Sequence, residues 1–280
     1  MTAIGIPSYR EWAETELTGP IAYSIVVPAY NESERILPTV GAIAAHLCSL
    51  GEPWELIVAD DGSSDDTVAL LEGLELANMR VLKAQQNGGK GSAVRRGVLA
   101  SRGHMILFAD ADQSTPIQQF ETLRAELEAG ADVVIGSRSA AGASVANKSL
   151  ARKIFSKGLN VLVQFGFGVP FADTQCGFKM FTAESGHLLF SRQLIDEFSF
   201  DLEILYLAQK LDLAVAEVPV EWIDAPGSTV DAGKVALEFL RDMAQIRWND
   251  LKGRYDQPNH AKVAVNASHL GLLAASSKGR

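Results

Sequence analysis

The sequence predicts an α/β fold in which a mostly parallel central sheet is flanked by helices. Runs of apolar and β-branched residues alternate with amphipathic helical stretches through the first half of the chain. Such alternation is typical of strands joined by crossover helices, a connection that makes neighbouring strands parallel. Three of these runs end in polar clusters, at the position where an open parallel sheet binds its ligands. With 280 residues, 47% of them hydrophobic, the chain is long enough to bury a substantial core.

The first half is predicted to alternate strands and helices without interruption. The strands cover residues 23–30, 54–63, 79–84, 104–112 and 131–138. The helices between them cover residues 36–50, 67–75, 91–101 and 116–129. Asp65 or Asp66 is expected to cap the second helix, and Thr115-Pro116 to open the fourth.

After residue 140 the alternation becomes less regular. We expect a helix at 149–167, a loop and short strand in 171–181, a helix at 200–211, an alternating strand at 214–222 and a long amphipathic helix at 232–255. The two ends of the chain have weak patterns. We expect residues 1–20 to be peripheral and residues 256–280 to form a mobile tail.

Composition and charge exclude several classes of protein. The formal net charge of −9 argues against a nucleic-acid-binding role. Cys48 and Cys176 are the only cysteines, which predicts a reducing compartment and no disulfide framework. The first 20 residues show no secretory signal, and the longest apolar stretch, 158–171, is shorter than the roughly 20 residues that a span needs. We therefore expect a cytoplasmic protein that does not cross a membrane.

Two acids one residue apart, Asp110 and Asp112, close the apolar run at 104–112. A helix cap needs one side chain, so capping leaves the second acid at a repulsive distance from the first. Two neighbouring carboxylates are stable together when a cation lies between them. Oxygen ligands without His or Cys indicate Mg²⁺ or Mn²⁺ whose coordination is completed by substrate phosphates.

Motifs in both halves of the chain carry a family resemblance. The stretches "SIVVPAYNESERI", "VADDGSSDDT", "NGGKGSAVRRG" and "FADAD" occur in this order, and with them the chain resembles family-2 glycosyltransferases of the GT-A type. The segments "VIGSR", "DTQCGFKMF", "FDLEIL" and "VPVEWIDAPGSTV" are similar to those of dolichyl- or polyprenyl-phosphate sugar transferases, nearest the dolichyl-phosphate β-glucosyltransferases. The resemblance implies one GT-A domain over residues 1–255, with a Rossmann-like nucleotide-sugar half (22–112), an acceptor half (113–223) and a C-terminal helix (224–255).

The resemblance implies an inverting transfer of glucose from UDP-glucose to a polyprenyl phosphate, with Mg²⁺ or Mn²⁺ as cofactor. It assigns the nucleotide-sugar site to Pro28, Tyr30, Glu32, Asp60, Asp61, Lys90, Asp110 and Ala111. Asp110 and Asp112 are the implied metal ligands. Mannose synthases of this kind read D-x-D-x-Q, whereas here Gln113 follows the second Asp directly and Ser114 stands at the Gln position. The third metal ligand is therefore left open.

The acceptor needs a cationic clamp and no general base, because a phosphate monoester is already mostly ionised at neutral pH. The resemblance assigns the clamp to Arg138 and Arg152, which with Asp112 are the implied catalytic residues. Its further acceptor-binding candidates are Asp173, Gln175 and Lys179. Asp201 and Glu203 match an acidic pair of the family, although acids at a helix start also favour the helix dipole. Cys176 is expected to be a packed residue.

Several alternatives stay open at this point. In the first, the donor is GDP-mannose. In the second, the acceptor is a soluble phosphorylated or hydroxyl compound such as a glycerate. In the third, the chain is an inactive module that binds a nucleotide sugar. A dehydrogenase is disfavoured because no G-x-G-x-x-G follows the first strand, and "NGGKGSAVRRG" lacks the ending of a Walker motif. The helix at 149–167 either contacts a membrane surface or packs in the core.

Overall fold

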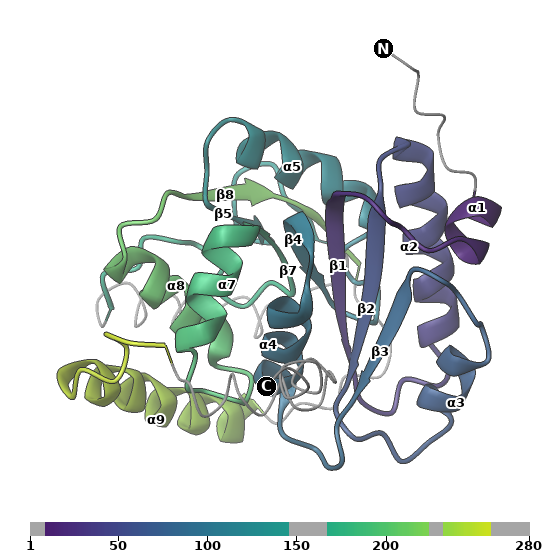
Figure 1. The fold of residues 1–280 in the computed structure, drawn as a ribbon. Coiled ribbons are helices and arrows are strands. Elements are labelled where there is room, and N and C mark those ends of the chain that lie inside the picture. Colours follow the sequence, from purple (N-terminus) through teal and green to yellow (C-terminus); the bar gives the residue numbers. More distant parts are fainter. Residues whose placement is uncertain (1–8, 146–166, 224–231, 259–280) are drawn as a thin grey trace, which may run out of the picture.

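The computed structural model describes residues 9–145, 167–223 and 232–258. Its centre is a seven-stranded sheet with the order β3-β2-β1-β4-β7-β5-β8 (Figure 1). Neighbouring strands in this sheet are parallel except where β7 pairs with β4 and with β5. The prediction of a mostly parallel sheet flanked by helices is therefore confirmed.

The strands of the large sheet are β1 (Ile21–Ala29), β2 (Trp54–Asp60), β3 (Met79–Lys83), β4 (Gly103–Ala109), β5 (Val133–Ser137), β7 (Phe178–Thr182) and β8 (Val215–Pro219). A two-stranded sheet pairs β6 (Ser144–Val145) with β9 (Glu221–Trp222). The helices are α1 (Tyr9–Glu14), α2 (Ile36–Leu50), α3 (Thr67–Glu72), α4 (Lys90–Ala100), a 3₁₀ turn η1 (Ile117–Gln119), α5 (Phe120–Glu128), α7 (Ala183–Arg192), α8 (Phe200–Lys210) and α9 (Ala232–Leu251).

Two hydrophobic cores lie on the two faces of the sheet. Alternate residues of β1 belong to opposite cores, because successive side chains of a strand point to opposite faces. Ile25 and Val27 face the core that also holds residues of α1, α2, α3 and α5. Val26 faces the core that holds residues of α4, α7, α8 and α9. Both faces of the sheet are therefore covered, so a ligand can reach the sheet only at an edge.

The sheet opens at its carboxyl edge between β1 and β4. Pairing of β1 with β4 ends at Val26, whereas pairing with β2 continues to Ala29. Pro28 lies in this last stretch, where the missing N–H costs no hydrogen bond to β4. On its other side β4 continues to pair with β7 as far as Ala109. The gap between the two central strands is the local cause of the cavity described below.

The structure differs from the sequence-based expectation mainly after residue 130. The expected strand at 214–222 is interrupted, so that β8 joins the large sheet and β9 pairs with β6. Helix α7 has no predicted counterpart. The expected helix at 149–167 lies outside the described residues except for its last residue, and the expected tail lies outside them from residue 259. Within the described part of the chain, no helix is both long enough and apolar enough to span a bilayer.

A buried carboxylate at the amino end of the sheet gives a stability prediction. Glu55 is fully buried and accepts hydrogen bonds from Ser24 Oγ (2.7 Å), Arg80 Nη2 (3.0 Å) and Arg102 Nε (3.0 Å). Burial alone would raise the pKa of Glu55, but these partners outweigh it and the pKa is lowered. The ionised form therefore stabilises the fold above the unfolded pKa of about 4.3, and this contribution is lost as the pH falls through the lower folded pKa.

We expect Glu55→Gln to lower the free energy of unfolding at pH 7 by roughly 2 kcal/mol, the scale of charge-assisted hydrogen bonds. Urea denaturation at pH 7 and at pH 3 measures it, and the difference from the unsubstituted protein should shrink at the lower pH. The exposed Glu126→Gln is the control and should change little at either pH. An equal loss at both pH values would contradict an origin in the ionised carboxylate.

Candidate active site

Two adjoining loops follow β1 and β2 at the carboxyl edge of the sheet. Asn31 N donates to Ser63 Oγ (2.9 Å), and Ser33 N donates to Asp65 Oδ2 (3.1 Å). The other oxygen of Asp65 accepts from Thr67 N (3.0 Å) at the start of α3. Burial raises the pKa of Asp65, but the hydrogen bonds from Thr67 and Ser33 lower it to about 2. Of the two expected caps, Asp65 makes the bond and Asp66 does not.

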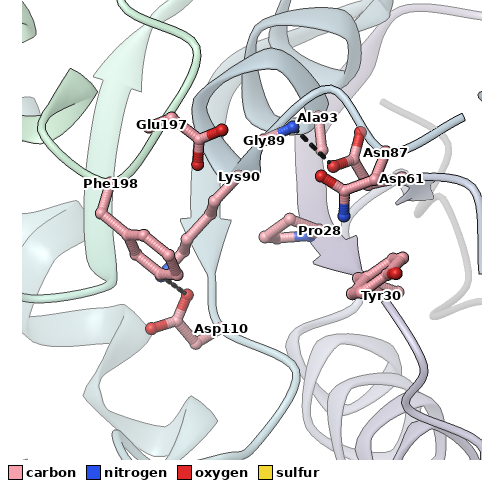
Figure 2. A pocket seen from close by; sticks show the side chains of 11 residues that line it. Pro28, Tyr30, Asp61, Asn87, Gly89, Lys90, Ala93, Asp110, Glu197 and Phe198 are labelled. Atoms are coloured by element: carbon pink, nitrogen blue, oxygen red, sulfur yellow. Dashed lines mark hydrogen bonds and ion pairs between the residues drawn. The ribbon is translucent and has the colours of Figure 1, made fainter. Parts of the chain in front are cut away.

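A cavity of about 380 Å³ lies at the gap between β1 and β4 (Figure 2). Its lining comes from five parts of the chain. These are the end of β1 with the loop after it, the residue directly after β2, the glycine-rich loop with the first turn of α4, the residue directly after β4, and the segment before α8. The lining residues are Pro28, Ala29, Tyr30, Asp61, Asn87, Gly89, Lys90, Ala93, Asp110, Glu197 and Phe198. Five of the residues predicted to bind the nucleotide sugar, namely Pro28, Tyr30, Asp61, Lys90 and Asp110, are thus together in one cavity.

Asp61 holds the glycine-rich loop in place. Its carboxylate accepts from Gly88 N (3.1 Å) and Gly89 N (2.8 Å), and Arg96 Nη2 lies 3.4 Å from Oδ1. Burial is the largest influence on Asp61 and raises its pKa despite these bonds. Gly89 has φ +95°, and a Cβ there would lie 2.4 Å from Asp196 O, so this position requires glycine. The loop therefore enters α4 with Lys90 directed into the cavity.

Lys90 and Asp110 form an ion pair across the cavity floor, with 2.6 Å between Nζ and Oδ1 (Figure 2). The ammonium also lies 5.4 Å from the centre of the Phe108 ring and 5.9 Å from that of Phe198. Burial alone would lower the pKa of Lys90, but the carboxylates of Asp110 and Asp201 outweigh it and the pKa is raised. The lysine is therefore a permanent cation beside the first acid of the D-x-D pair.

A smaller cavity of about 110 Å³ adjoins the same aspartate. It is lined by Asp110, Asp112, Ser114, Thr115, Arg138, Gln175, Gly177 and Trp222. Asp110 lines both cavities, so they meet at this carboxylate. The D-x-D pair thus stands between one compartment that contains Lys90 and another that contains Arg138.

Arg138 is held in the smaller cavity by a bidentate ion pair. Its Nε and Nη2 donate to the two oxygens of Asp173 at 2.6 and 2.8 Å, and its guanidinium lies 5.7 Å from the Trp222 ring centre. Burial would lower the pKa of Arg138, but Asp173 outweighs it and the pKa is raised. Burial would likewise raise the pKa of Asp173, whereas Arg138 lowers it. The guanidinium is oriented but still 24% exposed, which leaves donors for an anionic ligand.

The loop after Asp112 shows what the Gln113 side chain contacts. Asp112 Oδ1 accepts from Ser114 N (2.9 Å), and Gln113 has a positive φ of 54°. The Gln113 amide nitrogen donates to Thr39 Oγ1 (3.2 Å), and Thr39 in turn donates to Ala111 O (2.6 Å). Gln113 is therefore engaged with α2. The described residues contain no group of three or more His, Cys, Asp or Glu side chains placed to hold a metal ion.

The remaining predicted residues lie around the two cavities. Asp60 is buried and accepts from Gly62 N (3.0 Å) and Ser63 N (3.2 Å), so it shapes the loop after β2. Ala111 is buried. Glu32 is bonded to Arg35 (2.7 Å), and burial raises its pKa. None of these three side chains lines either cavity.

Lys179 and the acidic pair of α8 are buried behind the site. Lys179 Nζ donates to Cys176 O and to Asp201 Oδ1, each at 2.6 Å. Glu203 accepts from Ile195 N (2.9 Å) and Tyr255 Oη (2.6 Å), so it ties the segment before α8 to the end of the described chain. Burial raises the pKa of Cys176 to about 11, which fits the expected packed residue. Arg152, with Lys153 and Lys157 nearby in sequence, lies outside the described residues.

Gly177 is a site residue that the sequence analysis missed. Its carbonyl accepts from Asp110 N (3.0 Å), and a Cβ at Gly177 would lie 1.9 Å from Asp110 Oδ2. We expect Gly177→Ala to displace the Asp110 carboxylate and lower the turnover rate about 100-fold, the cost of a displacement of about 1 Å in a catalytic group. The stability should change by less than about 1 kcal/mol, because the obstructed atoms are the carboxylate of a side chain that is 30% exposed and can turn away.

Initial rates and urea midpoints of Gly177→Ala test this expectation. Gly41→Ala is the matched control, because a Cβ at Gly41 meets nothing within 4 Å. Full activity of the Gly177 variant would show that the Asp110 carboxylate does not need its observed position.

Comparison with solved structures identifies the fold. Among solved structures, mannosyl-3-phosphoglycerate synthase from Rubrobacter xylanophilus superposes with a TM-score of 0.63 at 20% identity, covering 85% of this chain and 76% of that one. Glucosyl-3-phosphoglycerate synthase from Mycobacterium tuberculosis, in complex with Mn²⁺, UDP-glucose and glycerol 3-phosphate, superposes with a TM-score of 0.57 at 20% identity, covering 85% and 82%. The fold is thus that of the GT-A glycosyltransferases.

The sequence comparisons identify the family. The model of glycosyl transferase family 2 matches residues 24–197. The dolichyl-phosphate beta-glucosyltransferase of Dictyostelium discoideum is 39% identical over 83% of this chain and 76% of its own length. The human dolichyl-phosphate beta-glucosyltransferase is 33% identical over the same shares, 83% and 76%. The chain belongs to glycosyl transferase family 2.

Proposed function

We propose that the protein transfers glucose from UDP-glucose to a dolichyl-type polyprenyl phosphate with inversion at the anomeric carbon. The observation that carries the proposal is the pair of cavities that meet at Asp110, one with Lys90 and the other with Arg138. Such a pair suits a donor and an acceptor that both carry phosphate. The relatives named above as dolichyl-phosphate beta-glucosyltransferases support the choice of sugar and lipid.

The larger cavity takes the nucleotide sugar in this proposal. Tyr30 is 47% exposed at its rim and offers a face for the nucleobase. The Asp61 carboxylate already accepts two hydrogen bonds from the glycine-rich loop, and its remaining lone pairs accept from a base N–H or a ribose hydroxyl. Lys90 meets the diphosphate, because its ammonium is the cation that lines this cavity beside Asp110.

The donor set of Asp110 and Asp112 fits Mg²⁺ or Mn²⁺. Both residues are carboxylates, and Asp110 already forms an ion pair with a cation, Lys90. Because Gly177 has no side chain, there is space beside the Asp110 carboxylate. Two protein carboxylates are a typical share for a cation that takes its other ligands from phosphates and water. When bound, such an ion would offset the negative charge that develops on the leaving diphosphate.

The smaller cavity takes the acceptor phosphate. The Arg138 guanidinium, fixed by Asp173, binds and orients the phosphate, and Gln175 adds a polar group beside it. A phosphate oxygen forms the new bond to the anomeric carbon as the bond from that carbon to the UDP oxygen breaks. The electron pair leaves on UDP, and no proton has to be removed from the acceptor. Arg152 is proposed as a second clamp residue.

We place this reaction at the cytoplasmic face of a membrane, to which the protein binds peripherally. The support is the low water solubility expected of a polyprenyl acceptor and the sequence-based expectation of a cytoplasmic chain. The acidic composition supports the further proposal that nucleic acid is no partner.

Lys90→Met should change metal and donor binding in opposite directions. In the free protein the ammonium occupies the Asp110 carboxylate, so its removal should raise the affinity for Mn²⁺ alone about tenfold, or about 1.4 kcal/mol. The affinity for UDP should fall, because one cation beside the diphosphate is gone. Electron paramagnetic resonance of free Mn²⁺ measures the first effect, and calorimetry measures the second. Lys83→Met, at an exposed ion pair, is the control. Unchanged Mn²⁺ affinity would contradict the competition.

Calorimetric titration with UDP-glucose and with GDP-mannose, each with Mg²⁺, tests the donor assignment. We expect UDP-glucose to bind at least tenfold more tightly. Tighter binding of GDP-mannose would replace the glucosyltransferase proposal with a mannose synthase.

A further inference from the structure

The outward face of α9 is apolar along one stripe. Leu240 is 41% exposed, Trp248 56% and Leu251 81%. Their spacing places the three side chains on the same side of the helix. Phe239, Met243 and Ile246 face the other way and are buried in the core. The helix therefore packs with one apolar face and presents a second apolar stripe to its surroundings.

Basic side chains border this stripe. Arg241, Lys252 and Arg254 are exposed, and Lys252 Nζ lies 4.8 Å from the centre of the Trp248 ring. Three acids of the same segment are paired with other side chains. Asp256 is 64% exposed, and its Oδ1 lies 3.0 Å from Lys210 Nζ. Asp242 accepts from Ser199 Oγ (2.6 Å), and Asp250 is bonded to Tyr206 and Lys210. The stripe thus has a positive border in a chain whose net charge is −9.

Helix α9 is linked to the segment that lines the larger cavity. In Figure 1, α9 runs along the same edge as the amino end of α4, which carries Lys90. The bond between Ser199 and Asp242 joins α9 to the segment whose Glu197 and Phe198 line that cavity. Phe198 is 68% exposed. The segment before α8 and α9 are therefore bonded neighbours, and each carries exposed apolar side chains.

We propose that Leu240, Trp248, Leu251 and their basic neighbours form a docking surface for an anionic lipid bilayer. This rests on the proposed function, because a lipid-phosphate acceptor has to be met at a bilayer. Tryptophan and leucine bordered by Lys and Arg are the composition of a helix that lies in the membrane interface. The basic border selects anionic lipid, since each cation near such a surface adds attraction.

Vesicle sedimentation tests the proposal. The full chain should bind vesicles of phosphatidylcholine with one quarter phosphatidylglycerol more tightly than vesicles of phosphatidylcholine alone. The double variant Trp248→Gln, Leu251→Gln should bind the anionic vesicles about tenfold more weakly. Lys252→Glu with Arg254→Glu should lose the preference for anionic lipid. Leu74→Gln, at an exposed leucine outside α9, is the control and should bind as the unsubstituted chain does. Urea midpoints establish that each variant is folded.

The readouts separate this proposal from the proposed function. Weaker vesicle binding of the α9 variants supports the docking surface even if no lipid phosphate accepts glucose. With a short, water-soluble polyprenyl phosphate, the variants should keep the transfer rate of the unsubstituted chain. Equal vesicle binding by the double variant, or no binding by the unsubstituted chain, would overturn the docking surface. A concentration-dependent dimer that the double variant loses would also overturn it, in favour of a second copy as the occupant.

Discussion

Asp112→Ala is expected to abolish measurable sugar transfer, with a loss on the order of a thousandfold or more. The carboxylate lines the smaller cavity next to Asp110 and receives a bond from Ser114 N, so its removal takes away half of the proposed metal-binding pair. The fold should survive, because Asp112 lies in a loop after β4 at the edge of the sheet. Initial rates at saturating Mg²⁺ and donor measure the loss.

Asp66→Ala is the matched control for that substitution. Asp66 is exposed, precedes α3 and makes no side-chain cap bond, so its removal should leave the rate within about twofold. If Asp112→Ala retained full activity in the presence of a chelator, the metal proposal would be wrong. A loss of activity together with a collapsed urea midpoint would instead place Asp112 among the structural residues.

Arg138→Lys is expected to raise the KM for the acceptor lipid phosphate about 10- to 100-fold and to leave the KM for the donor unchanged. Arginine binds phosphate through a planar fork, and lysine keeps the charge without that geometry. The expected factor corresponds to one charge-assisted hydrogen bond of about 1.5–3 kcal/mol. Arg138→Ala should have the larger kinetic effect, but it also leaves Asp173 buried without its bidentate partner. Steady-state kinetics with each substrate varied in turn measures both constants.

Arg10→Ala, at a residue 83% exposed on α1, controls for the loss of a positive charge. A defect confined to the donor KM would move Arg138 from the acceptor cavity to the nucleotide sugar. An equal rise in the KM for the donor and the KM for the acceptor, together with a lowered urea midpoint, would make the Arg138–Asp173 pair a structural element of the site.

The first half of the fold could be predicted because its buried strands are continuous stretches of apolar residues. Strands β1, β2 and β4 are apolar on both faces, which is the pattern of a central parallel strand. Helix α7 was missed because its buried face includes Ser185 and Gly186, which hide the apolar period. The reversed direction of β7 was not predicted, because its antiparallel pairings with β4 and β5 are tertiary contacts that leave no pattern in the sequence of the strand.

The site was predictable where polar residues directly follow a strand. Asp61 and Asp110 follow β2 and β4, and the parallel sheet brings them to one edge. Glu197, Phe198 and Trp222 were missed because their positions depend on tertiary contacts. Glu203, which matches an acidic pair of the family, accepts a hydrogen bond from Ile195 N and so holds the segment that carries Glu197 and Phe198.

Transfer of labelled sugar to a defined acceptor tests the central claim most directly. The protein is given labelled UDP-glucose or GDP-mannose with Mg²⁺, and either a polyprenyl phosphate or 3-phosphoglycerate, with a chelator-treated sample beside each. We predict label in the lipid fraction only with UDP-glucose, polyprenyl phosphate and the metal ion together. Label in 3-phosphoglycerate, with none in the lipid, would contradict the assignment of the Arg138 cavity to a lipid phosphate.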